Sequence, residues 1–149
     1  MTEPHGMTRT IQKTISMPAH PRFLNEVRTL LNDALGEANV PKHDRDLIVL
    51  AVDEAVSSVV KYAKFKGYEN EISLTIDIND VRFKATLVDS LNVYDFSFNH
   101  GQTEAQVAER LEKERSYTMG IFLIRQIMDE ITYTYKKGFQ NELELIKFL

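Results

Sequence analysis

A stripe of polar side chains lies along an otherwise apolar segment, residues 47–63, and holds the first groups that could do chemistry. The spacing i, i+1, i+4, i+5 and i+8 places these side chains on one side of a helix: Asp53, Glu54, Ser57, Ser58 and Lys61. Glu54 and Ser58 are one turn apart, so a carboxylate that could act as a general base stands beside a hydroxyl oxygen. The same spacing also fits the solvated edge of a core helix, an interpretation that needs no chemistry.

Two other segments carry groups that could face a ligand. Asp89 ends an alternating strand, where an acidic residue often only caps a turn. Residues 116–121 form a loop of mostly small or polar residues that enters an apolar helix at Gly120. Free backbone N–H groups at a helix N-terminus attract phosphate, although water or a capping side chain satisfies them equally well. Neither segment specifies a function by itself.

The composition excludes several other kinds of site. With no cysteine, the chain has no disulfide scaffold, no thiolate-bound zinc or iron–sulfur cluster and no cysteine nucleophile. The four histidines are scattered without the spacing of paired metal ligands, which argues against a histidine metal site. Neither a GxSxG motif nor a Walker-type phosphate loop occurs.

The charge balance bears on partners and location. Eighteen Lys and Arg against 22 Asp and Glu give a formal charge of −4, opposite in sign to that of a general binder of nucleic acid or anionic membrane. No run of 18 apolar residues exists, so we expect no membrane-spanning helix. The polar N-terminus does not resemble a signal peptide, and the expected location is the cytoplasm.

Periodicity predicts the elements that must position these groups. After a flexible tail at residues 1–10, we expect a strand at 11–17, a helix at 22–35 capped by Gly36, and a long helix at 43–64 that ends before Gly67. Alternation then predicts strands at 71–79 and 81–89, joined by a tight turn at Asn79–Asp80.

The remainder is predicted as a polar loop with a weak helix at 92–116, a helix at 120–130, and strands at 131–135 and 142–148 around a turn at Lys137–Gly138. This order predicts a single α+β domain over residues 11–149. We expect a two-layer sandwich with a mixed, mostly antiparallel sheet and helices on one face, because a doubly wound parallel sheet requires strands that alternate regularly with helices.

In their order and separation, these segments resemble the ATP-binding domain of the anti-sigma-factor serine/threonine-protein kinases, which belong with the histidine-kinase and gyrase ATPases to the GHKL (Bergerat) fold. The first sequence box of that family is similar to LAVDEAVSSVVKYA, and the second is similar to VDSLNVYDF. The third box, with the strand that follows it, is similar to MGIFLIRQIMDEITY. The resemblance covers nearly the whole chain after residue 10.

The resemblance implies roles for individual residues in a site for ATP and Mg²⁺. Glu54 occupies the position of the catalytic base that accepts the proton of the attacking serine hydroxyl. Asp89 stands where the family's carboxylate binds the adenine amino group, and Gly120 matches the last glycine of the phosphate loop. Residues 100–116 correspond to the lid over the nucleotide.

Three positions of this implied site depart from the family pattern. Ser58 replaces the asparagine that helps to hold Mg²⁺, and a serine hydroxyl is a shorter and poorer ligand than an amide oxygen. Leu91 replaces a glycine beneath the adenine, and Thr118 replaces the first glycine of the phosphate loop. Phosphoryl transfer depends on metal, positioning and electrostatics, so we expect nucleotide binding to be weakened or lost.

The resemblance therefore favours an anti-sigma-factor-like regulator that binds a sigma factor, an antagonist with a STAS domain, or both, in a partner-switching system. One alternative is an active ATP-dependent serine/threonine-protein kinase that phosphorylates a STAS-domain antagonist, with Ser58 or a water holding the metal. Another alternative is a non-catalytic dimerisation module. A homodimer is also implied by the resemblance.

Overall fold

The computed structural model describes residues 10–67, 70–89, 115–134 and 140–149, and for residues 65–66 and 115–120 it describes the backbone alone. Along the chain the elements are β1 (Ile11–Pro18), the short 3-10 helix η1 (Pro21–Phe23), α1 (Leu24–Glu37), α2 (Lys42–Lys66), β2 (Glu71–Ile78), β3 (Arg82–Asp89), α4 (Arg115–Ile127), β4 (Glu130–Thr134) and β5 (Asn141–Phe148). This order is the one that the hydrophobic periodicity predicts.

The five strands form one sheet in the order β1-β2-β3-β5-β4, and each neighbouring pair in it is antiparallel. Burial alternates along the strands, most regularly in β2 and β3, because successive side chains point to opposite faces of a strand. One face is apolar and buried, while the other carries residues such as Thr14 and Thr75, whose hydroxyl oxygens lie 3.2 Å apart.

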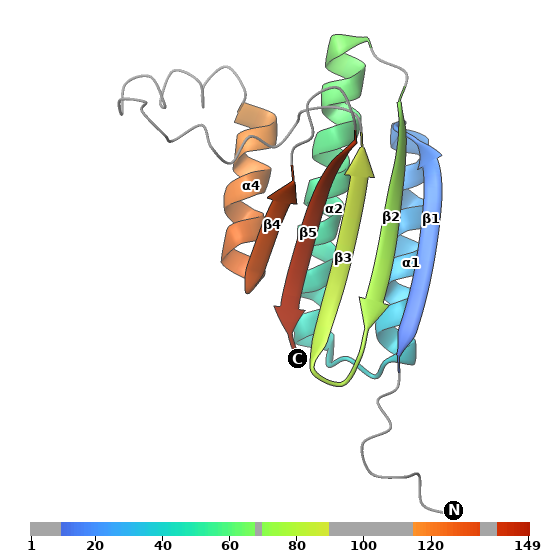
Figure 1. The fold of residues 1–149 in the computed structure, drawn as a ribbon, viewed down its shortest axis with the longest axis vertical. Coiled ribbons are helices and arrows are strands. Elements are labelled where there is room, and N and C mark those ends of the chain that lie inside the picture. Colours follow the sequence, from blue (N-terminus) through green and yellow to red (C-terminus); the bar gives the residue numbers. More distant parts are fainter. Residues whose placement is uncertain (1–9, 68–69, 90–114, 135–139) are drawn as a thin grey trace, which may run out of the picture.

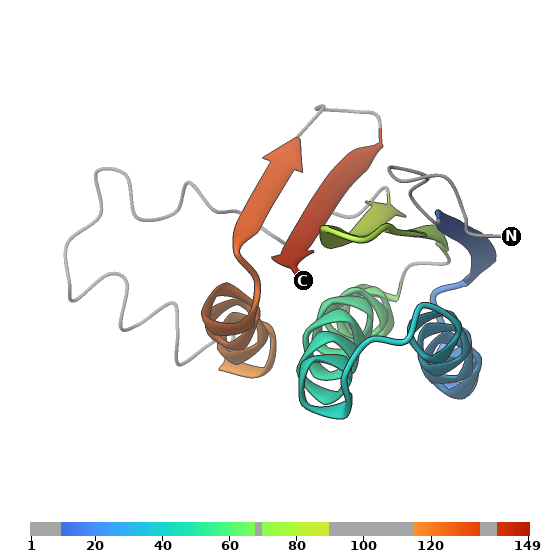
Figure 2. The same ribbon diagram turned by 90° about the horizontal axis from the view of Figure 1, so that it is seen from below.

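Helices α1, α2 and α4 all cover the apolar face of the sheet, as Figures 1 and 2 show. Helix α2 packs between α1 and α4, so it is the central element of the helical layer. The core between the two layers contains these large, fully buried side chains: Leu31, Leu35, Ile48, Phe83, Ile72, Leu74, Ile76, Ile78, Leu87, Ile124 and Leu143. The predicted α+β sandwich with helices on one face is confirmed.

The ends of the first two helices test the predicted caps. Gly67 follows α2 with φ 70°, a left-handed conformation that glycine adopts at little cost, so the predicted end of this helix is confirmed. The prediction that Gly36 caps α1 is wrong, because α1 continues through Glu37 and its cap is Ala38. Asn39, at φ 58°, takes the left-handed position instead, which asparagine tolerates better than most residues.

The turn between β2 and β3 is held by the side chain of Asn79, whose Oδ1 accepts hydrogen bonds from the backbone N–H groups of Val81 and Arg82, both at 2.9 Å. Asparagine side chains commonly stabilise turns in this way. Val81, the first residue of the strand predicted at 81–89, lies in the turn and is 65% exposed. The strand therefore starts one residue later than predicted, at Arg82.

Among the residues that the structure describes, no helix combines the length and the hydropathy needed to cross a lipid bilayer.

Candidate functional site

Glu54 and Ser58 lie one turn apart on α2, but their side chains do not contact each other through a hydrogen bond. The hydroxyl of Ser58 donates a hydrogen bond to the backbone carbonyl oxygen of Glu54 at 2.7 Å. The side chain of Ser58 is buried, and the residue is only 1% exposed. Glu54 is half-buried, and its carboxylate makes no hydrogen bond or ion pair within the described part of the chain. A carboxylate with this exposure can reach a ligand outside the helix, whereas Ser58 is turned to the helix backbone.

The polar stripe of α2 therefore contains both buried and exposed residues. Ser57 and Ser58 are buried, so the interpretation of the stripe as one solvated edge is wrong for these two positions, although Lys61 is exposed. A serine can be buried in a helix because its hydroxyl bonds to a carbonyl one turn earlier, as Ser58 does. Spacing alone cannot distinguish this arrangement from a solvent-facing stripe.

Asp53, the neighbour of Glu54, is held by an ion pair that links α2 to α1. The guanidinium of Arg28 donates through Nε to Oδ1 of Asp53 at 2.8 Å and through Nη2 to Oδ2 at 3.2 Å. Its Nη1 donates to Asn25 Oδ1 at 3.1 Å. The hydrogen bond and the charge of Asp53 raise the pKa of Arg28 above its ordinary value, since both favour the charged guanidinium. Sequence reasoning missed Arg28, whose partner lies 25 residues away.

Asp89 ends β3 on the face of the sheet that the helices cover. It is 3% exposed and lies opposite Asn141, the first residue of β5, in the strand register. Asn141 is also buried, so two polar residues stand together at this end of the sheet. Sequence reasoning missed Asn141, although the alternation of Leu143 and Leu145, extended back by two residues, places it on the inward face.

The residues predicted to form a phosphate loop lie in a helix instead. Helix α4 begins at Arg115, so Thr118 and Gly120 lie within its first turns, and the prediction of a loop at 116–121 that ends at Gly120 is wrong. One glycine inside a helix costs only about 1 kcal/mol, which the packing of Ile121 and Ile124 against the core can offset. The helix also ends at Ile127 rather than at residue 130. Leu91, most of the predicted lid and the turn at Lys137–Gly138 lie outside the described residues.

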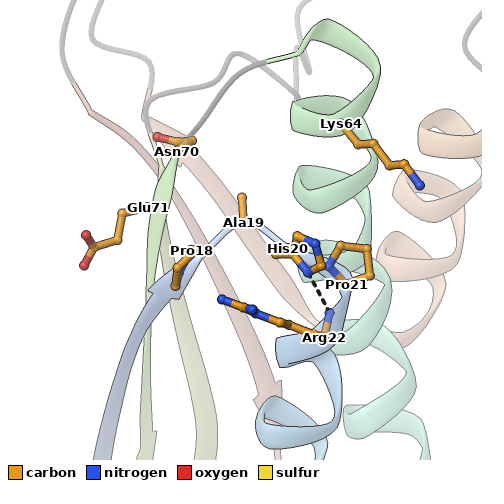
Figure 3. Close-up of a pocket in the computed structure, with 8 residues that line it drawn as sticks. All are labelled: Pro18, Ala19, His20, Pro21, Arg22, Lys64, Asn70 and Glu71. Atoms are coloured by element: carbon orange, nitrogen blue, oxygen red, sulfur yellow. Dashed lines mark hydrogen bonds between the residues drawn. The ribbon is translucent and has the colours of Figure 1, made fainter.

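A surface groove of about 630 Å³ lies where β1 ends and β2 begins. It is lined by residues from the end of β1 and the segment after it, from α2, and from the start of β2: Pro18, Ala19, His20, Pro21, Arg22, Lys64, Asn70 and Glu71. Figure 3 shows that the charged ends of Arg22 and Lys64 point in different directions, and that Glu71 points away from Lys64. Because these groups do not converge, the groove lacks the concentrated polar contacts typical of a small-molecule site. None of the predicted site residues lines it.

The arrangement on α2 does not fit a bound divalent cation. Mg²⁺ requires oxygen ligands in near-octahedral geometry. The oxygen of Ser58 is buried, and both carboxylate oxygens of Asp53 accept hydrogen bonds from the cationic Arg28, whose charge repels a second cation there. Glu54 is therefore the one carboxylate of this stripe without a cationic partner in the described structure. Within the described ranges, no group of three or more His, Asp and Glu side chains is placed to hold a metal ion.

Comparison with known proteins places this fold in a family. A chain of the SiaB–SiaC complex from Pseudomonas aeruginosa shares the fold with a TM-score of 0.66 and 13% identity, over 90% of this chain and 88% of that one. The serine-protein kinase RsbW of Staphylococcus epidermidis is 28% identical over 139 residues, which are 89% of this chain and 84% of the relative.

The RsbW protein of Listeria innocua serovar 6a is 28% identical over 127 residues, which are 84% of this chain and 80% of the relative. The sequence profile of the histidine kinase-like ATPase domain matches residues 17–147, from the end of β1 to the last strand. The chain belongs to the histidine kinase-like ATPase domain family.

Proposed function

We propose that this protein is an anti-sigma-factor-like regulator that binds a sigma factor, a STAS-type antagonist, or both, and that its ATP binding is weakened or lost. The similarity to proteins named serine-protein kinase RsbW, which extends over most of both chains, supports a common ancestry with protein kinases. The observation that carries the proposal is the buried hydroxyl of Ser58, bonded to the helix backbone at the position where the resembling kinases have a metal ligand.

Partner binding and catalysis make separate demands on this fold. Binding a protein requires a stable surface, which the sheet and the described helices provide, whereas phosphoryl transfer also requires positioned phosphates and a metal. The weakened site therefore removes catalysis without removing binding. Sigma factors and their antagonists act in the cytoplasm, and we propose the same location for this chain, which we expect to be a homodimer.

An active kinase is the second candidate, and one observation favours it. The carboxylate of Glu54 is half-buried and makes no hydrogen bond or ion pair within the described residues, so it is available to accept a proton. In this alternative, Glu54 would be the general base, Asp89 would contact adenine, and Leu91, Thr118 and Gly120 would lie around the nucleotide. ATP and Mg²⁺ would then be required.

Mixing the purified chain with sigma factors and STAS-domain proteins encoded in the same genome, with labelled ATP and Mg²⁺, tests the proposal. We expect a stable complex by gel filtration and no transfer of label. Transfer that disappears in Glu54→Ala would establish the kinase instead. No complex with any of these proteins would leave a dimerisation module.

A further inference from the structure

The hydroxyl of Ser58 on α2 is hydrogen-bonded within the helix and is not directed to a ligand. In the described structure its hydroxyl hydrogen is directed to the carbonyl oxygen of Glu54, at 2.7 Å, and the residue is 1% exposed. A metal ligand must direct a lone pair of its oxygen to an ion that also keeps several waters. A side chain with almost no accessible surface cannot meet a hydrated ion without rotating out of its bond.

The neighbouring carboxylates do not replace Ser58 as ligands. Both oxygens of Asp53 receive hydrogen bonds from Arg28, and the positive charge of this guanidinium opposes the approach of a divalent cation to Asp53. Glu54 alone supplies one carboxylate from this helix. Across the part of the chain that the structure describes, no three acidic or histidine side chains are grouped for a metal.

From these observations we infer that any nucleotide that binds at α2 does so without a divalent cation, and that the serine at position 58 is the cause. The ligand class is therefore a metal-free nucleotide. This inference rests on the proposed function, since it concerns the same site, and it names the part of that site that is missing.

Manganese is a suitable probe because a paramagnetic ion broadens the NMR signals of nearby amides. We would add Mn²⁺ to the full chain in the presence of excess ATP and follow the amide signals of Glu54 and Ser58. The inference predicts no selective broadening of these signals relative to the amides of β2, with or without ATP. Selective broadening of the α2 signals would overturn it.

Two substitutions at the same position sharpen the result. In Ser58→Ala the Mn²⁺ spectrum should match that of the wild type, because the hydroxyl does not touch the ion. In Ser58→Asn the side chain is longer and carries an amide oxygen, a better metal ligand than a hydroxyl, and we expect Mn²⁺–ATP to bind at least about tenfold more tightly than to the wild type. A folded Ser58→Asn variant with no gain would overturn the role of residue 58. Should the amide not fit, as judged by its spectrum, the wild-type and Ser58→Ala spectra decide alone.

Calorimetry in EDTA separates this inference from the proposed function. Tight binding of ATP without metal would contradict the weakened nucleotide site but would agree with a metal-free ligand. Tight binding that depends on Mg²⁺ and is lost in Ser58→Ala would contradict both. Tight Mg²⁺-dependent binding with broadening that persists in Ser58→Ala would also overturn the inference, because a metal would then sit at α2 on other ligands.

Discussion

The hydroxyl of Ser58 donates to the carbonyl oxygen of Glu54 across one turn of α2, at 2.7 Å. The two polar residues of this turn are therefore joined through the helix backbone and not through the carboxylate of Glu54. The carboxylate of Glu54 makes no hydrogen bond or ion pair within the described structure, while the hydroxyl of Ser58 is bonded to the helix backbone.

This relationship predicts a small effect of Ser58→Ala on stability. Loss of the hydrogen bond costs about 1 kcal/mol, and the better helix propensity of alanine returns about 0.5 kcal/mol. The net loss in the free energy of unfolding should be about 0.5 kcal/mol, measured by urea denaturation, with Ser57→Ala as the matched control. A loss above about 2 kcal/mol would mean that the hydroxyl does more than bond to one carbonyl.

The ion pair between Arg28 and Asp53 predicts an asymmetry between its two partners. The side chain of Asp53 is 18% exposed and that of Arg28 is 43% exposed, so removing Arg28 leaves the more buried charge without its partner. Arg28→Ala should therefore destabilise the fold more than Asp53→Ala, by about 1 kcal/mol.

The exposed pair of Lys42 and Asp46 is the control for this comparison. Lys42→Ala should change the free energy of unfolding by less than about 0.5 kcal/mol, because exposed pairs one helical turn apart contribute little. Equal losses for Arg28→Ala and Asp53→Ala would contradict the assignment of Asp53 as the partner that depends on the pair.

Much of the architecture could be predicted from the sequence. A strand or helix with one buried face has apolar residues at every second position or at three-to-four spacing, and both patterns can be recognised in the sequence. The strand at Glu71–Ile78 is an example, with four isoleucine or leucine side chains directed to the core. Helix ends were less predictable. Gly36 and Gly120 each indicate a cap or a loop when considered alone. Both lie inside a helix, because α1 extends to Glu37 and α4 starts at Arg115.

The candidate site was only partly predictable. The family resemblance implies roles for Glu54 and Asp89, and both residues lie within the described structure. The sequence could not reveal that Asp53 pairs with Arg28 or that Asn141 lies opposite Asp89, because these relationships depend on how α1, α2 and the strands come together. Whether Ser58 faces solvent or the helix backbone is likewise decided by its rotamer and packing.

The glycines of the two helix ends predict opposite effects of the same substitution. Gly67→Ala should lower the free energy of unfolding by about 1 kcal/mol, because φ is 70° and alanine is strained there although the surrounding space is open. Gly36→Ala should raise it by about 0.5 kcal/mol, because Gly36 is helical and a Cβ would meet only Arg45 Nη1 at 3.8 Å. Urea denaturation of both variants checks the signs, and equal signs would contradict the described backbone.

The packing of α4 on α2 predicts a contrast within α4 itself. Ile124 is fully buried, so Ile124→Ala should cost about 3 kcal/mol in the free energy of unfolding. Phe122 is 47% exposed, and Phe122→Ala should cost less than about 1 kcal/mol despite the larger side chain. A larger loss for Phe122→Ala would place the opposite face of α4 against the core.

The impaired nucleotide site is tested most directly by a calorimetric titration of the folded protein with ATP, in the presence of Mg²⁺ and again in EDTA. We predict weak or undetectable binding and no strengthening by Mg²⁺, because the polar stripe of α2 offers the ion no ligand beyond Glu54. Micromolar binding that strengthens with Mg²⁺ would contradict it and would identify a working nucleotide site.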